Sequence, residues 1–231
     1  EHRRPFIVME YVRGTLLRDL MHRRSLTIQE TIDYAEGVLT ALEFSHRAGV
    51  IHRDIKSSNI MITDAGLVKV MDFGIARAIS DSSATQAHTS GIVGTAQYFS
   101  PEQARGETVD ARTDLYSTGV LLYEMLAGRP PFTGDTAVSV AYQHVSEAVT
   151  APSAHNSLIG AELDQVVLHA LAKDRNERFQ SAEEFREHLL AAYTGSPITT
   201  KVATPLETIE SAAPVEPAEP VSPVAPADEA A

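Results

Sequence analysis

The longest regular pattern of apolar residues predicts a helix that begins after Thr27. Thr27 and Glu30 have the spacing of a capping box, in which each side chain accepts a hydrogen bond from the backbone N–H of the other residue. Gly49 is typical of the position just past a helix end. The apolar residues between them are separated alternately by four and three positions, which places them on one face of a helix. They are Ile28, Ile32, Ala35, Leu39 and Leu42.

Four further segments have the apolar spacing that is typical of helices. Residues 16–21 carry a short apolar face, and residues 163–171 carry another. Residues 115–126 are densely apolar, which predicts a helix that is buried on most sides. Ser181 and Glu184 have the spacing of a second capping box, so we expect a last helix to begin after Ser181.

Two regions favour extended structure, and one region favours neither helix nor strand. Residues 6–9 read Phe-Ile-Val-Met and predict a short buried strand. The apolar residues 60–62 and 67–70 flank an Asp-Ala-Gly turn, which predicts a β-hairpin. Residues 75–99 are rich in Ser, Thr, Ala and Gly and have little periodicity. That stretch is long for a connection without structure, so we expect it to be functional or mobile.

The composition is that of an ordinary globular protein with room for one sizeable domain in 231 residues. The chain has 31 Asp and Glu against 19 Lys and Arg, and this net charge of −12 argues against a nucleic-acid-binding surface. Cys is absent, which excludes disulfides and is compatible with a cytoplasmic location. No apolar run reaches the length of about 18 residues that a membrane span needs, so we expect no membrane contact by this segment.

The two ends of the sequence carry their own expectations. Residue 1 is Glu rather than Met, so we expect the chain to begin inside a longer reading frame. Residues 196–231 hold 7 of the 12 prolines and no aromatic residue. A segment of this kind cannot bury enough apolar surface to offset its chain entropy, so we interpret it as a disordered linker.

Two short motifs carry the chemistry. Residues 52–59 read His-Arg-Asp-Ile-Lys-Ser-Ser-Asn, and residues 72–74 read Asp-Phe-Gly. The two Asp residues of these motifs are 18 positions apart. The residue types suit phosphoryl transfer, since one carboxylate can receive a hydroxyl proton and one cation can lie beside the transferred group. An amide and a second carboxylate can hold a divalent cation between phosphates.

These motifs resemble the catalytic and metal-binding loops of protein kinases, and within them those of bacterial Hanks-type (eukaryotic-like) serine/threonine kinases. The resemblance covers residues 5–193. Residues 94–106 and 135–145 are similar to the actinobacterial receptor kinases that carry extracellular PASTA repeats. A place as the intracellular domain of a single-pass receptor would follow from that likeness.

The resemblance implies an α+β, protein-kinase-like fold, with a mainly helical C-terminal lobe, a small β-hairpin and a truncated N-terminal lobe. Residues 1–12 would be the remnant of the N-terminal lobe and the hinge, residues 13–195 the C-terminal lobe, and residues 196–231 the linker. The Gly-rich loop and the strand Lys that hold the phosphates in this family are not found in the sequence. We therefore expect negligible activity from this chain alone.

The resemblance assigns the catalytic roles residue by residue. Asp54 would be the catalytic base, and Lys56 would offset charge on the transferred phosphoryl group. Asn59 belongs to the same catalytic set. Asn59 and Asp72 would bind Mg²⁺ or Mn²⁺ through oxygen. Lys56 two residues after the Asp favours Ser and Thr over Tyr as acceptors.

ATP is the implied cosubstrate, and a hinge is expected to border its adenine. Met9, Glu10 and Val12 would contact adenine, the last two through backbone groups. Met61 and Met71 would supply apolar surface beneath it. Without the flanking motifs, methionines at strand positions would be interpreted as ordinary core residues.

The resemblance also implies regulation by phosphorylation. Arg53 would meet a phosphorylated residue of the activation segment through a charge-assisted contact. Thr89 is the first choice for that residue and Thr85 the second. The alternative is that this Ser- and Thr-rich stretch is only a polar loop. Thr95 is expected to form a hydrogen bond near the catalytic loop instead.

Other residues of the motifs are expected to be structural. Glu102 would pair with Arg178, and Asp114, placed at the start of the buried helix, would contact the backbone of the catalytic loop. His52 and Phe73 would pack beneath the site.

The function that follows is an ATP-dependent serine/threonine protein kinase that acts on protein substrates, with a kinase homodimer for autophosphorylation. One alternative is a catalytically silent kinase-like module that serves as a binding scaffold. Such modules often lose the base, the metal-binding Asp or the Lys, and the sequence keeps Asp54, Lys56, Asn59 and Asp72. A helical domain with accidental motif matches is a third alternative, and the number of motifs in the expected order argues against it.

Overall fold

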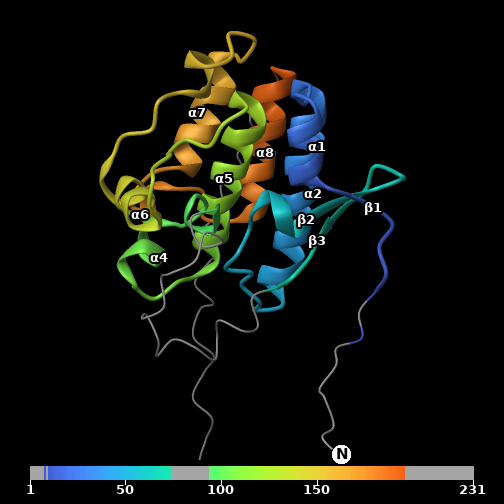
Figure 1. The fold of residues 1–231 in the computed structure, drawn as a ribbon, viewed down its shortest axis with the longest axis horizontal. Helices are drawn as coiled ribbons and strands as arrows, with labels where there is room; N and C mark the ends of the chain where they lie inside the picture. Colours follow the sequence, from blue (N-terminus) through green and yellow to red (C-terminus); the bar gives the residue numbers. More distant parts are fainter. Residues whose placement is uncertain (1–7, 9, 74–93, 196–231) are drawn as a thin grey trace, which may run out of the picture. The chain divides into compact units, whose positions relative to one another are not determined.

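The computed structural model describes residue 8 and residues 10–73 and 94–195. The described residues form a mainly helical body with one small antiparallel sheet at its side (Figure 1). This arrangement confirms the α+β fold class that the resemblance implies.

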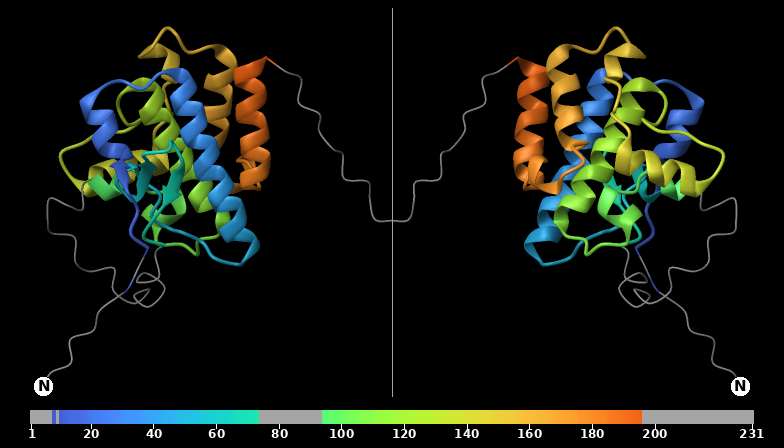
Figure 2. Two further views of the ribbon diagram at one scale, coloured as in Figure 1. Left: turned by 90° about the vertical axis from the view of Figure 1, so that its right-hand side faces the viewer. Right: turned by 90° about the vertical axis from the view of Figure 1, so that its left-hand side faces the viewer.

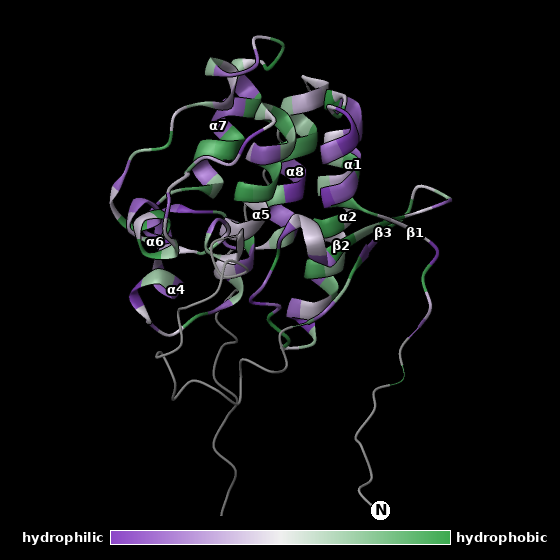
Figure 3. Cartoon of the chain, in the orientation of Figure 1, coloured by the Kyte–Doolittle hydropathy of each residue, from purple (hydrophilic) through white to green (hydrophobic). Residues whose placement is uncertain are grey.

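The body is built around α5 (Ala111–Ala127), whose residues are buried on almost every side. Helix α2 (Ile28–Arg47) contacts α5 and α8 (Ala182–Thr194), and α7 (Ala161–Ala170) contacts α5 and α8 as well. The two turned views of Figure 2 show these helices side by side. Apolar residues colour much of α5 in Figure 3, as the dense apolar run at 115–126 predicts.

The predicted start and end of α2 are confirmed. Thr27 Oγ1 accepts a hydrogen bond from Glu30 N at 3.2 Å, and Glu30 Oε2 accepts one from Thr27 N at 2.9 Å. Gly49, just past the end of α2, has a φ of 75°, which favours glycine. The five residues of the apolar stripe are all buried except Ile28, which is partly buried against the core.

The second capping box is only half formed. Ser181 accepts a hydrogen bond from Glu184 N at 3.0 Å, as expected. Glu184 Oε2, however, accepts a hydrogen bond from Gln180 N at 2.7 Å rather than from Ser181 N. The carboxylate reaches one residue further back, and α8 still begins where the sequence predicts.

The predicted hairpin is present and gains a third strand that the sequence analysis missed. Strands β2 (Ile60–Thr63) and β3 (Val68–Val70) are antiparallel, and β1 (Gly14–Leu16) pairs with the other edge of β2. A Cβ atom on Gly14 would lie 2.2 Å from Ile62 O, so only glycine allows this close approach. Leu16, expected on a helical face, therefore belongs to a strand, and α1 (Leu17–Arg23) begins one residue later.

Two other helices, α4 (Pro101–Arg105) and α6 (Ala137–Ser146), were not expected from the sequence. The strand expected at residues 6–9 is wrong at the one position that can be checked, because Val8 lies outside any strand and is 85% exposed. Its other three residues, Met9 among them, lie outside the described residues. Across the described parts of the chain, we find no helix with the length and apolar character needed to span a membrane.

Candidate active site

The loop of residues 52–59 is fixed to α5 by a buried carboxylate. Asp114 Oδ2 accepts a hydrogen bond from His52 N at 2.8 Å, and Asp114 Oδ1 accepts one from Arg53 N at 2.7 Å. His46 Nε2, from α2, lies 2.8 Å from Asp114 Oδ2. Asp114 makes the expected contact with the loop backbone, but it lies in the first turn of α5 rather than at its start, since the helix begins at Ala111.

Arg53 holds a strained backbone conformation at the centre of this anchor. Its φ is 67°, in the left-handed region that non-glycine residues rarely adopt. Besides the bond to Asp114, Arg53 O accepts a hydrogen bond from Gln103 Nε2 at 2.8 Å. Gln103 was not singled out from the sequence, although Ser100 and Gln103 have capping-box spacing and form that box around α4.

The His52 side chain contacts both the loop of residues 52–59 and the segment of residues 71–73. Asp54 N donates a hydrogen bond to His52 Nδ1 at 3.2 Å, so the ring proton belongs on Nε2, which donates to Met71 O at 2.9 Å. The His52 ring also lies 4.6 Å from the Phe73 ring, centre to centre. The packing role expected for His52 and Phe73 agrees with these contacts.

The three residues expected to be catalytic form one cluster. Lys56 Nζ lies 2.7 Å from Asp54 Oδ2, and Asn59 Nδ2 donates to the same oxygen at 3.0 Å. Asn59 Nδ2 also donates to Asp54 O at 2.9 Å, which holds the turn closed. Lys56 Nζ donates in addition to Thr95 Oγ1 at 3.4 Å, where a hydrogen bond of Thr95 was expected. The Asp54 and Lys56 side chains remain 25% and 19% exposed.

Asp72 follows the end of β3 by two positions. The β2–β3 ladder continues past Ile60 and Val70 through a hydrogen bond from Met71 N to Asn59 O at 2.8 Å. Asp72 has a φ of 58° and an exposed side chain. The ladder therefore brings the residue before Asp72 directly opposite Asn59.

The donors at this end of the hairpin fit a hard divalent cation. The amide nitrogen of Asn59 is turned to Asp54, which leaves the amide oxygen as the atom that suits a cation. Asp72 supplies a carboxylate. Among the described residues no group of three or more His, Cys, Asp or Glu is placed to hold a metal. One carboxylate and one amide are typical of Mg²⁺ sites that are completed by water and phosphate oxygens.

The face of the sheet that turns away from the core carries Met61, one of the residues expected near adenine. Ile60 and Ile62 of β2 are buried in the core, so Met61 points to the other face, where it is paired with Leu16 and Lys69. Lys69 Nζ lies 3.2 Å from Glu10 Oε1. Residue 10 is thereby brought beside this face.

The remaining expected residues are placed as follows. Val12 and Met71 are half-buried. Met9 and the two candidate phosphorylation sites, Thr85 and Thr89, lie outside the described residues.

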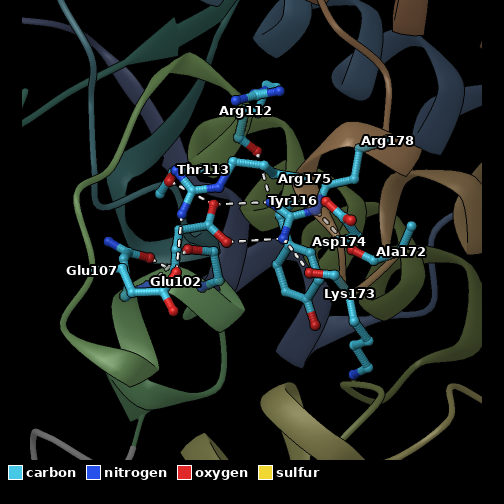
Figure 4. A network of polar contacts seen from close by, with 12 residues as sticks. Glu102, Glu107, Arg112, Thr113, Tyr116, Ala172, Lys173, Asp174, Arg175 and Arg178 are labelled. Carbon is cyan, nitrogen blue, oxygen red and sulfur yellow. Dashed lines mark hydrogen bonds and ion pairs between the residues drawn. The ribbon is translucent and has the colours of Figure 1, made fainter.

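Glu102 and Arg178 form a fully buried ion pair at the base of α4 (Figure 4). Arg178 Nη1 and Nη2 donate to the two carboxylate oxygens of Glu102 at 2.9 and 2.8 Å. Thr113 Oγ1 donates to Glu102 Oε1 at 2.7 Å. Burial by itself would raise the pKa of Glu102, but the guanidinium of Arg178 outweighs it and lowers the pKa to about 2.

Comparison with known proteins gives a consistent family. The sequence profile of the protein kinase domain matches residues 1–190. The chain is 56% identical over 200 residues to a probable serine/threonine-protein kinase of Streptomyces coelicolor, which covers 86% of this chain and 30% of that relative. It is 54% identical over 194 residues to the serine/threonine-protein kinase PknB of Mycobacterium tuberculosis H37Rv, which covers 84% and 31%. The chain thus spans about 30% of the length of these curated relatives.

Proposed function

The chain belongs to the protein kinase domain family, and on this premise we propose that the whole protein is an ATP-dependent serine/threonine kinase. The observation that carries the proposal is the cluster in which Lys56 Nζ and Asn59 Nδ2 both contact Asp54 Oδ2, at 2.7 and 3.0 Å. Such a cluster presents a positioned proton acceptor beside a cation.

Asp54 is the proposed base. Asn59 holds one of its carboxylate oxygens, and the bond from Asp54 N to His52 fixes the backbone beneath it. The acceptor hydroxyl of a protein substrate would donate its proton to Asp54 and be aimed by it at the γ-phosphorus of ATP. Alignment of this kind supplies much of the rate enhancement in phosphoryl transfer.

Lys56 is the proposed electrostatic group. Its ammonium is already desolvated on one side, since the side chain is 19% exposed, and it bridges Asp54 and Thr95. A fixed positive charge at this place would stabilise negative charge on the transferred phosphoryl oxygens. A mobile surface lysine would do so less well, because it would have to be ordered during the reaction.

Asn59 and Asp72 are the proposed ligands of Mg²⁺ or Mn²⁺, which would supply charge neutralisation at the phosphates. The adenine of ATP would lie on the outward face of the sheet. Met61 and Met71 would form its apolar floor there, and the backbone of Glu10 and Val12 would border its edge.

Protein substrates with Ser or Thr acceptors are the proposed partners, together with a second copy of the kinase for autophosphorylation. Arg53 remains our candidate for binding a phosphate on Thr89 or Thr85. A cytoplasmic position for this part of the chain also remains a prediction.

The test is Asp54→Asn in the natural full-length gene product. We expect kcat for phosphorylation of a Ser/Thr peptide to fall by about 10²- to 10⁴-fold, which is the range for loss of a general base. The thermal midpoint should stay unchanged because the site lies at the surface of the body. Asp64→Asn is the matched control, since Asp64 lies in the hairpin turn with a side chain that is 72% exposed.

A full rate in Asp54→Asn would overturn the role assigned to Asp54. A full-length protein that transfers no phosphate would instead favour the silent-scaffold alternative. Loss of activity in Asp64→Asn as well would show that the assay reports folding rather than chemistry.

A further inference from the structure

A buried chain of polar side chains connects the catalytic loop to α5. Ser57 Oγ lies 3.0 Å from Tyr98 OH, and Tyr98 OH donates a hydrogen bond to Glu124 Oε2. Ser57 and Tyr98 are 4% and 7% exposed. A phenol has a single proton to donate, so its bond to Glu124 requires that Ser57 donates to Tyr98.

The electrostatics keep this direction of donation. Burial raises the pKa of Tyr98, and the neighbouring charge of Glu124 raises it further, so the phenol keeps its proton. Burial also raises the pKa of Glu124, while the hydrogen bond from Tyr98 acts in the opposite direction. Both hydroxyl groups of the chain are therefore used in a buried network, and such networks order the elements that they join.

The chain reaches the catalytic cluster through consecutive residues. Lys56, which contacts Thr95, is followed at once by Ser57, which contacts Tyr98. Tyr98 N in turn donates to Thr95 O at 3.2 Å. Two side-chain links thus hold the turn of residues 95–98 against the catalytic loop.

Helix α5 anchors both ends of that loop. Asp114, in its first turn, binds the backbone of residues 52 and 53. Glu124 is ten positions later, which is about 15 Å along a helix, and it holds Ser57 through Tyr98. The spacing of the two acids along a rigid helix sets where the catalytic loop can lie.

We propose that the Ser57–Tyr98–Glu124 chain is a positioning element, which holds residues 95–98 at a fixed distance from Asp54 and Lys56 so that the acceptor hydroxyl is aligned. Ser57 acts here through Tyr98 and touches no reacting atom. The proposal rests on the kinase function proposed above. It concerns the acceptor side of the reaction and leaves the binding of ATP unaffected.

The test uses Ser57→Ala in the natural full-length gene product. We expect kcat/KM for an acceptor peptide to fall roughly tenfold, because a small misplacement of aligned groups lowers the rate strongly. The KM for ATP and the thermal midpoint should stay at their original values, a split that general loss of structure would not produce. Ser57→Thr keeps a hydroxyl group and should restore most of the activity.

Ser58→Ala is the matched control, since Ser58 occupies the same 3₁₀ turn, Ser57–Asn59, and is not a member of the chain. A mutant cycle with Tyr98→Phe completes the design. If Ser57 acts through Tyr98, the double variant loses no more activity than Tyr98→Phe alone. Additive losses, or a Ser57→Ala enzyme that behaves like Ser58→Ala, would overturn the proposal.

The two proposals fail in different ways. An unsubstituted full-length protein that transfers no phosphate to any peptide would refute the kinase function and the positioning role with it. An active protein that loses its rate in Asp54→Asn but keeps it in Ser57→Ala would leave the function standing and refute the positioning role alone.

Discussion

Two of the carboxylate–cation pairs, Glu102–Arg178 and Asp54–Lys56, differ in burial and in the number of contacts that join them. Glu102 and Arg178 are joined by two parallel hydrogen bonds, and their side chains are 2% and 0% exposed. Asp54 and Lys56 meet through one contact of 2.7 Å and are 25% and 19% exposed. Arg178 keeps Glu102 ionised by lowering its pKa despite the burial, whereas the second pair remains open to an incoming group. Burial and the number of contacts thus separate a pair that holds structure from a pair that suits chemistry.

The buried pair uses an arginine and the partly exposed pair a lysine, and the number of their hydrogen-bond partners differs accordingly. Each nitrogen of Arg178 is used, and the three backbone acceptors are Ala172 O, Arg112 O and Lys173 O. A planar guanidinium satisfies so many partners because its donors point in fixed directions. Lys56 is a point charge with three donors, and only the carboxylate of Asp54 and the hydroxyl of Thr95 are its partners in the described contacts.

The largest effect is expected from Arg178→Ala. The change leaves Glu102 buried without its partner, which costs about 3–5 kcal/mol of unfolding free energy. Urea denaturation should show this loss together with a lower thermal midpoint. Arg186→Ala is the matched control, because Arg186 pairs with Glu43 at 3.2 Å while remaining 27% exposed, and such pairs contribute about 0–1 kcal/mol. Equal losses in the two variants would contradict the comparison.

The next effect is a dependence of stability on pH. The pKa of Glu102 is lowered from 4.5 to about 2 in the folded protein, so its contribution is complete above pH 4.5 and is lost as the pH falls toward 2. Between pH 6 and pH 3 we expect a loss of about 2 kcal/mol from this group. Denaturation curves of the original protein and of Glu102→Gln, measured at both pH values, isolate the contribution of Glu102, because the variant has no carboxyl group at this position.

Two other groups need to be separated from Glu102 in that experiment. Burial lowers the pKa of His144 from 6.5 to about 4. Stability is therefore also lost as the pH falls below 6.5, because the unfolded chain takes up a proton at His144 more readily than the folded protein does. This loss is the same in the original protein and in Glu102→Gln, so it cancels when the two are compared. Glu30 has a pKa lowered to about 2 by Arg24 at the surface. Glu30→Gln should change the pH dependence less, because solvent screens the exposed pair. A pH profile of Glu102→Gln that parallels the original would contradict the assignment.

The sequence predicted the elements of the body well because their signals are local. The capping box at Thr27 and the apolar stripe after it identify α2 within a single stretch of chain. Strand β1 gives no such signal, since its three residues become a strand only by pairing with β2. Helix α6 was missed because its capping box uses Ser139 in place of Glu or Gln.

In the candidate site, too, the contacts within one loop could be predicted, and the contacts between distant parts of the chain could not. The order of Asp54, Lys56 and Asn59 in one loop could be interpreted from residue types, and the structure brings these three together. The chain from Ser57 through Tyr98 to Glu124 joins residues 41 and 26 positions apart, so no local pattern indicates it.

The third prediction concerns the strained backbone of the catalytic loop. Arg53 has a φ of 67°, where a side chain costs energy and glycine does not. We therefore expect Arg53→Gly to be more stable than Arg53→Ala by about 1 kcal/mol, because both variants lose the guanidinium and only one relieves the strain. Urea denaturation of the two variants measures this difference directly. An Ala variant as stable as the Gly variant would show that the loop relaxes without the left-handed conformation.

The smallest effect on stability is expected from Lys56→Ala, in the pair that the comparison assigns to chemistry. Removing a partly exposed ammonium that holds one carboxylate should cost about 0.5 kcal/mol, because Asp54 keeps its bond from Asn59 and remains open to water. The rate of peptide phosphorylation by the full-length protein should fall by about 10²-fold or more, as for other groups that stabilise developing charge. Arg178→Ala should give the reverse pattern in the same two assays, a large loss of stability with little loss of rate. The rate must be measured at a temperature where that variant is still folded. A Lys56→Ala protein destabilised as strongly as Arg178→Ala would mean that exposure does not distinguish the two pairs.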